Sequence, residues 1–282
     1  MRYRDLLRKY NEYKSDDKKF EYKYIYDENL EKINLKYSIK SIAGVGNEFS
    51  QIKNVMTWVH DSIKHNGEVV IPSENLNIDG IIEGGREQGG TCFNLAIALS
   101  EAYLSLGFKS KYVRCRPMNY EDNHCHVVVQ VYLKNLKKWI MMDPSFNSYV
   151  MDSNKNILNL QEIRDALIKG EELLVSDEIN LNGQVFKKEK YIDYISKNIF
   201  RFETTQISGY NSENIRENKL VELDPLNYDG KDNNLKKISC AEKYIKENFI
   251  DDEDLVEFYN NIKDRALNET IYTNDKEMFW NI

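Results

Sequence analysis

Three side chains, those of Cys92, His126 and Asp143, are of the types that together carry out nucleophilic catalysis. Cys92 follows Gly89-Gly90-Thr91 and precedes an almost wholly apolar stretch from Leu95 to Leu106, so we expect it in the first turn of a buried helix capped by Thr91. A helix N-terminus stabilises a thiolate and lowers the pKa of a cysteine from about 8.5. Its free N–H groups can also stabilise the oxyanion that forms when a thiolate attacks a carbonyl. The alternative for any single cysteine is an inert, buried side chain.

His126 is the candidate base for this cysteine. It begins the run Val127–Tyr132, which is typical of a strand, so it lies at a strand end where a side chain can face a cleft. His124 shares that face because side chains alternate along a strand, and it competes for the role. Alternation sends Cys125 to the opposite face, so these three residues would not converge on a metal ion. The alternative for either histidine is a hydrogen-bonded structural side chain.

Asp143 is the candidate residue that orients the base. It ends a predicted strand at 138–143, although an aspartate before proline is also a common turn residue. A hairpin that turns through Lys134-Asn135 would place His126 directly opposite Asp143, with the two side chains about 5 Å apart on one face. A carboxylate in that position fixes the tautomer of the imidazole. His124 would face the residue two places further along.

The elements expected around these residues form an α+β fold, because a buried helix is followed by consecutive antiparallel strands. Five glycines between Gly80 and Gly90 predict an irregular loop in front of Cys92, since glycine permits positive φ and close backbone approach. The other periodicities predict helices at 3–13, 51–64, 160–169, 235–249 and 254–266, and strands at 20–26, 109–116, 124–133, 138–143, 199–207 and 219–223.

The predicted organisation has three parts. Residues 50–150 hold the candidate triad and form the expected catalytic core, and residues 1–49 are an N-terminal elaboration of a helix and a strand. Residues 151–282 are expected to be a C-terminal α/β elaboration of the same unit. Their role is open between a layer that covers the core and a lid that selects the substrate.

The stretches around the three candidate residues resemble the motifs of the transglutaminase-like superfamily, which run roughly G-x-C-x-x-x-A, H-x-x-V-x-V and W-x-x-x-D-P. The matching stretches are Gly90-Thr91-Cys92-Phe93-Asn94-Leu95-Ala96, His126-Val127-Val128-Val129-Gln130-Val131 and Trp139-Ile140-Met141-Met142-Asp143-Pro144. The resemblance covers about residues 50–150 and implies a papain-like core with Cys92 as nucleophile, His126 as base and Asp143 as orienter. The strand departs from common family residues at Val128 and Gln130, which leaves the substrate open.

The resemblance also implies an activity: an acyl group is taken from an amide of a protein or peptide through a cysteine thioester. The acyl group would pass to water or to an amine, and we favour hydrolysis slightly over transamidation. Gln88 is the candidate side-chain donor to the oxyanion, with an ordinary solvated loop residue as the alternative. His124 is a candidate substrate contact.

Two other functions remain open from the sequence. An arylamine N-acetyltransferase uses a related Cys-His-Asp arrangement in a chain of similar size. Against it, Glu87-Gln88-Gly89-Gly90 lacks an arginine before the glycine pair, and Asp143-Pro144-Ser145 lacks that family's glycine after the aspartate. A non-catalytic binding module on the same fold is the second alternative.

Composition narrows the class of protein further. The net charge of −7 and the lack of a basic stripe argue against a partner that is a nucleic acid or an anionic membrane. The chain has no apolar run of about 18 residues, and Met1–Lys9 lacks the apolar centre of a signal peptide, so we expect a cytoplasmic protein. Four cysteines without a CxxC pair predict free thiols, and no metal or cofactor is expected. The oligomeric state is not indicated.

Overall fold

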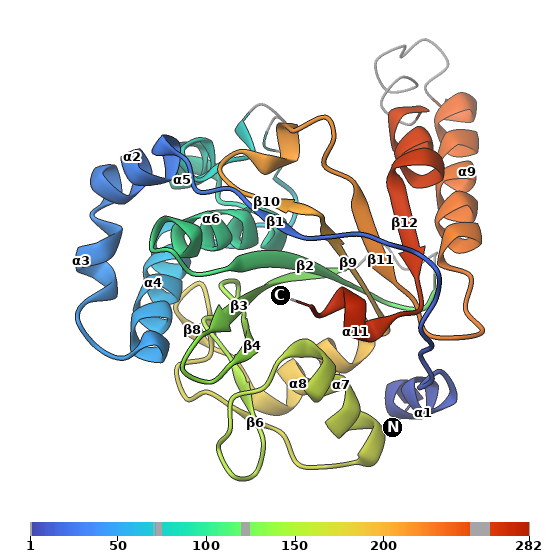
Figure 1. Cartoon of the computed structure of the whole chain (residues 1–282), viewed down its shortest axis with the longest axis horizontal. Helices are drawn as coiled ribbons and strands as arrows, with labels where there is room; N and C mark the ends of the chain where they lie inside the picture. Colours follow the sequence, from blue (N-terminus) through green and yellow to red (C-terminus); the bar gives the residue numbers. More distant parts are fainter. Residues whose placement is uncertain (1, 70, 72–74, 120–124, 249–259, 282) are drawn as a thin grey trace.

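A six-stranded sheet separates two groups of helices (Figure 1). The structure is a computed structural model and describes residues 2–69, 71, 75–119, 125–248 and 260–281. The strand order is β12-β11-β9-β2-β3-β4, with antiparallel neighbours except for β11 and β12, which are parallel. These strands are β2 (Ser110–Arg116), β3 (His126–Leu133), β4 (Lys138–Met142), β9 (Arg201–Thr205), β11 (Leu220–Leu223) and β12 (Thr270–Thr273). The fold is therefore α+β, as the sequence predicts.

The helices cover the two faces of this sheet and enclose two apolar cores. One core lies between the sheet and α2–α6, and the other lies between the sheet and α1, α7 and α8. Neighbouring residues of β3 belong to opposite cores: Val127 and Val129 to the first, Val128 to the second. The helices are α1 (Arg2–Lys9), α2 (Glu28–Tyr37), α3 (Ile39–Ala43), α4 (Glu48–Ser62), α5 (Ile78–Gln88), α6 (Cys92–Ser105), α7 (Leu160–Lys169), α8 (Lys188–Asn198), α9 (Gly230–Asn248) and α11 (Lys276–Phe279).

Short strand pairs and turns complete the described chain. The pairs β1–β10, β5–β6 and β7–β8 form three small two-stranded sheets. Their bounds, with those of two short helical turns, are β1 (Lys23–Tyr24), β5 (Val150–Met151), β6 (Leu174–Val175), β7 (Asn180–Leu181), β8 (Gln184–Val185), β10 (Ile207–Ser208), η2 (Ser212–Asn214) and η3 (Arg265–Glu269).

Helix α6 begins at Cys92, which confirms the predicted start. Thr91 is its N-cap: the Thr91 hydroxyl accepts from the Asn94 N–H, and the Asn94 side chain accepts from the Thr91 N–H. This reciprocal capping satisfies two backbone donors and fixes where the helix starts. The eleven residues from Asn94 to Leu104 are all buried, as an apolar helix in the centre of a fold requires.

The loop predicted at 80–90 is wrong, because most of that stretch is helix α5. Its glycines are part of the helix, and Gly85 is required for packing. A Cβ on Gly85 would lie 2.9 Å from Cγ2 of Ile63 in α4, so glycine lets the two helices approach closely. Of the five glycines, only Gly89, with φ of +81°, has the positive φ that favours glycine, and it ends the helix.

The predicted register of β3 and β4 is also wrong, by two residues. Leu133 pairs with Lys138 and Val129 pairs with Met142, so the turn spans 134–137 instead of two residues. Lys137 closes that turn at φ +50°. A shift of two residues leaves every side chain on its predicted face, because alternation has a period of two. Asp143 therefore stays on the face of His126, displaced diagonally along the strands.

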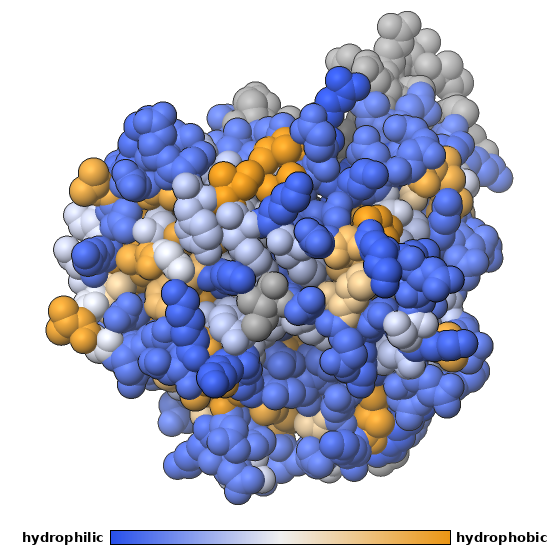
Figure 2. Space-filling view, in the orientation of Figure 1, coloured by the Kyte–Doolittle hydropathy of each residue, from blue (hydrophilic) through white to orange (hydrophobic). Residues whose placement is uncertain are grey.

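The C-terminal half continues the sheet that the core begins. β9 pairs with β2, β11 pairs with β9, and β12 pairs with β11, so half of the sheet comes from beyond residue 200. β9 and β11 lie within the strands predicted at 199–207 and 219–223. The face in Figure 2 is mainly hydrophilic, with apolar residues in small separate groups. No helix in the described ranges is both long and apolar enough to span a membrane.

Candidate active site

The carboxylate of Asp143 is buried and fully hydrogen-bonded. His126 Nε2 lies 2.6 Å from Oδ2, and the Tyr191 hydroxyl donates to the same oxygen at 2.8 Å. The backbone N–H groups of Ser145 and Phe146 donate to Oδ1 at 3.0 and 3.3 Å. Four donors hold the carboxylate in one orientation, so it can orient the imidazole in turn.

His126 is buried, and its two ring nitrogens have different surroundings. Because Nε2 faces the Asp143 carboxylate, the neutral ring carries its proton on Nε2. Nδ1 has no hydrogen-bond partner among the described atoms. Phe146 and Tyr194 pack edge-on against the ring, with centroid distances of 5.7 and 5.0 Å. Burial lowers the pKa of His126, but the charge and hydrogen bond of Asp143, together with Cys92, raise it to about 10.

Cys92 is half-buried at the first position of α6. Burial raises the pKa of its thiol, but the nearby side chains of His126 and His65, the positive charge of His126 and the Val127 N–H lower it to about 6. The lowered pKa of Cys92 and the raised pKa of His126 favour a thiolate–imidazolium pair at neutral pH. Such a pair provides a nucleophile and a proton donor side by side.

His65 is a site residue that the sequence did not reveal. It forms an isolated β-bridge with Gly90, two residues before the cysteine. The Asn182 side chain holds its backbone from the other side: Asn182 Oδ1 accepts from the His65 N–H at 2.7 Å, and Asn182 Nδ2 donates to the His65 carbonyl at 3.0 Å. Asn182 lies in the turn between β7 and β8 at φ +53°. A residue of the C-terminal half thus fixes a histidine beside Cys92.

Sequence reasoning also missed the aromatic side chains around the base. Tyr191 and Tyr194 are three residues apart on α8, so both lie on the helix face that meets Asp143 and His126. That spacing was the only available signal, and it points equally well to an ordinary core face.

The structure does not bring Gln88 to the cysteine. Gln88 is exposed at the end of α5, and its side-chain nitrogen lies beside Gly84 on its own helix, 3.7 Å from where a Cβ there would stand. Its contact toward the loop is made by its carbonyl, which accepts from Asn66 Nδ2 at 2.9 Å. His124 lies outside the described residues. Cys92, His126 and Asp143 do come together, and His65 joins them.

The other three cysteines have no comparable surroundings. Cys115 is buried, and burial raises the pKa of its thiol well above its ordinary value. Cys125 and Cys240 are exposed. No group of three or more His, Cys, Asp or Glu residues suited to hold a metal ion occurs within the part of the chain that the structure describes.

Comparison with known proteins finds a family model that matches the central segment. Residues 36–144 match the family model described as the transglutaminase-like superfamily. One similar solved structure is from Cytophaga hutchinsonii and is provisionally described as a cysteine protease; it has 14% identity and a TM-score of 0.33. The match covers 52% of this chain and 46% of that chain, so it spans less than half of that protein's length. No curated protein matches the sequence.

Proposed function

We propose that this protein is a cysteine-dependent enzyme that opens an amide through a thioester, because residues 36–144 match the family model of the transglutaminase-like superfamily. The orientation of His126 supports this most strongly. Its Nε2 faces Asp143, while Nδ1 is left for the Cys92 thiol. Cys92 is the nucleophile, His126 is the acid and base, and Asp143 is the orienter.

In the first half-reaction, the Cys92 thiolate attacks the amide carbonyl carbon and forms a C–S bond. The carbonyl oxygen becomes an oxyanion beside the N-terminus of α6, where free N–H groups can stabilise it. The C–N bond then breaks, and the His126 imidazolium gives its Nδ1 proton to the leaving amine. The products are a free amine and a thioester on Cys92.

In the second half-reaction, neutral His126 takes a proton at Nδ1 from the incoming nucleophile. Water gives a carboxylic acid, and an amine gives a new amide; either restores the Cys92 thiolate. We propose hydrolysis of a protein or peptide amide as the main reaction, with transamidation as the alternative. A competing primary amine separates the two.

We assign the role of side-chain oxyanion donor to His65 rather than Gln88. The His65 side chain is one of the nearby groups that lower the pKa of Cys92. The β-bridge to Gly90 and the two hydrogen bonds from the Asn182 side chain hold the His65 backbone. A hydrogen-bond donor beside the thiolate is also close to the carbonyl carbon that the thiolate attacks, and therefore to the oxyanion that forms there.

The test is to trap the acyl-enzyme. The protein is mixed with peptides from a denatured protein, quenched in acid within seconds and mapped by mass spectrometry. We expect an acyl adduct on Cys92, new peptide N-termini at longer times, and neither in Cys92→Ala. In the presence of a fluorescent primary amine, label on the peptides would indicate transamidation. Adducts spread equally over Cys92 and the exposed Cys240, or none on Cys92, would contradict the proposal.

A further inference from the structure

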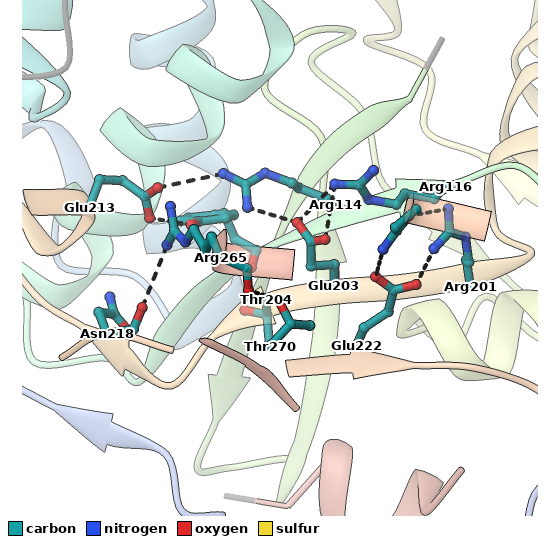
Figure 3. Close-up of polar contacts among 12 residues, drawn as sticks. Arg114, Arg116, Arg201, Glu203, Thr204, Glu213, Asn218, Glu222, Arg265 and Thr270 are labelled. Carbon is teal, nitrogen blue, oxygen red and sulfur yellow. Dashed lines mark hydrogen bonds and ion pairs between the residues drawn. The ribbon is translucent and has the colours of Figure 1, made fainter. Parts of the chain in front are cut away.

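A row of charged side chains crosses the sheet on the face covered by α6. Arg114 on β2 pairs with Glu203 on β9, Glu203 pairs with Glu222 on β11, and Glu222 pairs with Tyr272 on β12. Directly paired residues point to the same face, so the row is continuous, and Figure 3 shows its arginines and glutamates side by side. The three charged residues of this row, Arg114, Glu203 and Glu222, are largely buried, which makes their charge balance important.

The ion pairs in this cluster share their partners. Arg114 Nη1 lies 2.9 Å from Glu203 Oε1, and Arg116 Nη2 lies 2.9 Å from Glu203 Oε2, so one carboxylate serves two guanidinium groups. Arg114 Nη2 lies 3.5 Å from Glu213 Oε2, which is a long contact. The side chains of Arg114 and Arg116 are 15% and 23% exposed, so both cations retain a face toward solvent.

Arg265 adds a positive charge to the cluster that no described carboxylate balances. Its Nη2 donates only a 3.5 Å bond to the Asn218 carbonyl, and its Nε is buried without a hydrogen-bond partner. Asp224 lies near Glu222 and is buried. Burial and the negative charge of Glu222 both raise the pKa of Asp224, which disfavours its charged form. The cluster drawn in Figure 3 thus has one more arginine than glutamates; its members are Arg114, Arg116, Arg201, Arg265, Glu203, Glu213 and Glu222.

A cavity of about 830 Å³ opens onto this cluster between the sheet, α9 and η3. Arg114, Arg116 and Arg265 line it, so its polar wall is mainly cationic. The opposite walls are largely apolar and include Leu220, Ile238, Ala241, Ile262 and Ala266. The volume is in the range of small-molecule sites, and the lining suits an anionic group attached to an apolar body.

The cavity, called the arginine cavity below, shares one lining residue, Arg114, with the surroundings of the candidate nucleophile. Arg114 is the cross-strand partner of Val127, the residue that follows His126. The Arg114 guanidinium also stacks 4.4 Å above the ring of Phe93, the residue after Cys92. One side chain therefore lines the cavity and contacts the first turn of the helix that presents the thiol.

We propose that the arginine cavity binds a carboxylate of the acyl substrate while its amide lies at Cys92. This inference rests on the proposed function and narrows it to acidic substrates. Planar guanidinium groups bind carboxylates through two parallel hydrogen bonds. The arginines that line the cavity supply the positive charge that a carboxylate requires. The apolar wall holds the carbon chain between the carboxylate and the amide.

The experiment uses alkylating probes of graded length. N-substituted iodoacetamides carry an alkyl chain that ends in a carboxylate or, in the matched probe, in an uncharged carboxamide. The rate constant for modification of Cys92 is measured by peptide mapping. At one chain length, the carboxylate probe is expected to react at least about tenfold faster than its carboxamide partner, because guanidinium–carboxylate bonds are charge-assisted. Probes with shorter alkyl chains should show a smaller ratio between the rate constants of the carboxylate and carboxamide forms.

Variants test whether the arginine cavity causes the preference for the carboxylate probe. Arg265→Gln should remove most of the preference for the carboxylate probe, while Lys32→Gln, which removes one exposed charge on α2, should keep it. Thermal melting checks that both variants are folded. A carboxamide probe that reacts slowly with wild-type Cys92 would contradict the proposed function itself. Fast reaction with no charge preference at any length, or a preference that survives in folded Arg265→Gln, would overturn only the arginine cavity as a substrate site.

Discussion

The hydroxyl of Tyr191 donates to Oδ2 of Asp143 at 2.8 Å, the same oxygen that faces His126. This bond connects α8, in the C-terminal half, to the candidate triad in the segment that matches the family model. Tyr191 is fully buried, so its hydroxyl cannot replace this bond with a hydrogen bond to bulk water. We propose that residues 151–282 are part of the catalytic unit and not only a cover over it.

Tyr191→Phe should lower turnover and stability together. The ring still fills its place, but Asp143 loses one of four donors and holds His126 less firmly. We expect kcat/KM to fall by about three- to tenfold and stability to fall by about 1 kcal/mol, the usual contribution of one buried hydrogen bond. Steady-state kinetics and urea unfolding measure both. Unchanged kcat/KM in a destabilised Tyr191→Phe would limit the bond to a structural role.

Asp143→Asn should leave the protein folded but nearly inactive. The asparagine amide can donate to His126 Nε2, which would move the ring proton to Nδ1 and block proton uptake from Cys92. A loss on the order of 10³ or more in turnover is expected, by analogy with other triads. Single-turnover acylation with circular dichroism measures activity and fold together. Near-normal acylation in folded Asp143→Asn would remove Asp143 from the mechanism.

The two histidines of the β3 region should differ sharply. His126→Ala should abolish acylation of Cys92, because it removes the only imidazole in contact with Asp143 among the described residues. His124→Ala should cost far less, through packing or substrate contact alone. Single-turnover acylation of both variants is the comparison. An inactive His124→Ala beside an active His126→Ala would mean that the base is misassigned.

His65→Ala should slow acylation and raise the pH at which Cys92 reacts. Both effects have one cause, because the His65 side chain is one of the groups that lower the pKa of Cys92. We expect a fall of about 100-fold, at the lower end of the range for loss of one oxyanion donor. Asn182→Ala should shift both readouts in the same direction by less, because it only frees the His65 backbone. A His65→Ala variant with an unshifted pH profile would contradict the contact with Cys92.

Two neighbouring glycines of α5 should respond oppositely to alanine. A Cβ on Gly85 would lie 2.9 Å from Cγ2 of Ile63, so Gly85→Ala should destabilise by about 1–3 kcal/mol through overpacking. At Gly84 the nearest atom is the flexible Gln88 amide at 3.7 Å, so Gly84→Ala should stabilise the helix by about 0.5–1 kcal/mol. Urea denaturation of both variants tests the assignment of 78–88 as a packed helix.

Residues near the candidate triad in sequence were predictable, and those that reach it from afar were not. The starts of α6 and β3 follow from local signals: an N-cap threonine before a long apolar run, and a valine-rich stretch after His126. Helix α5 was hidden because glycine is a poor helix former, and only the position of Ile63 explains why glycine is needed at Gly85.

The register between β3 and β4 also shows what local sequence patterns cannot predict. A two-residue turn and the observed turn at 134–137 place the same side chains on the same face, so alternation could not tell them apart. The contact between His126 and Asp143 was predictable for that reason, although their predicted alignment was wrong. Tyr191, Asn182 and the arginine cavity depend on pairings between distant segments, which no local pattern encodes.

The most direct test of the account is the pH dependence of Cys92 alkylation by iodoacetamide, read by peptide mapping. Because the pKa of Cys92 is lowered to about 6, its rate should rise through pH 6 and be nearly constant from pH 7 to 9. Turnover should follow the same rise and fall again near pH 10, where His126 loses its proton. The exposed Cys240 is the internal control. A Cys92 rate that instead rises only around pH 8.5, as for an ordinary cysteine, would contradict the thiolate–imidazolium pair.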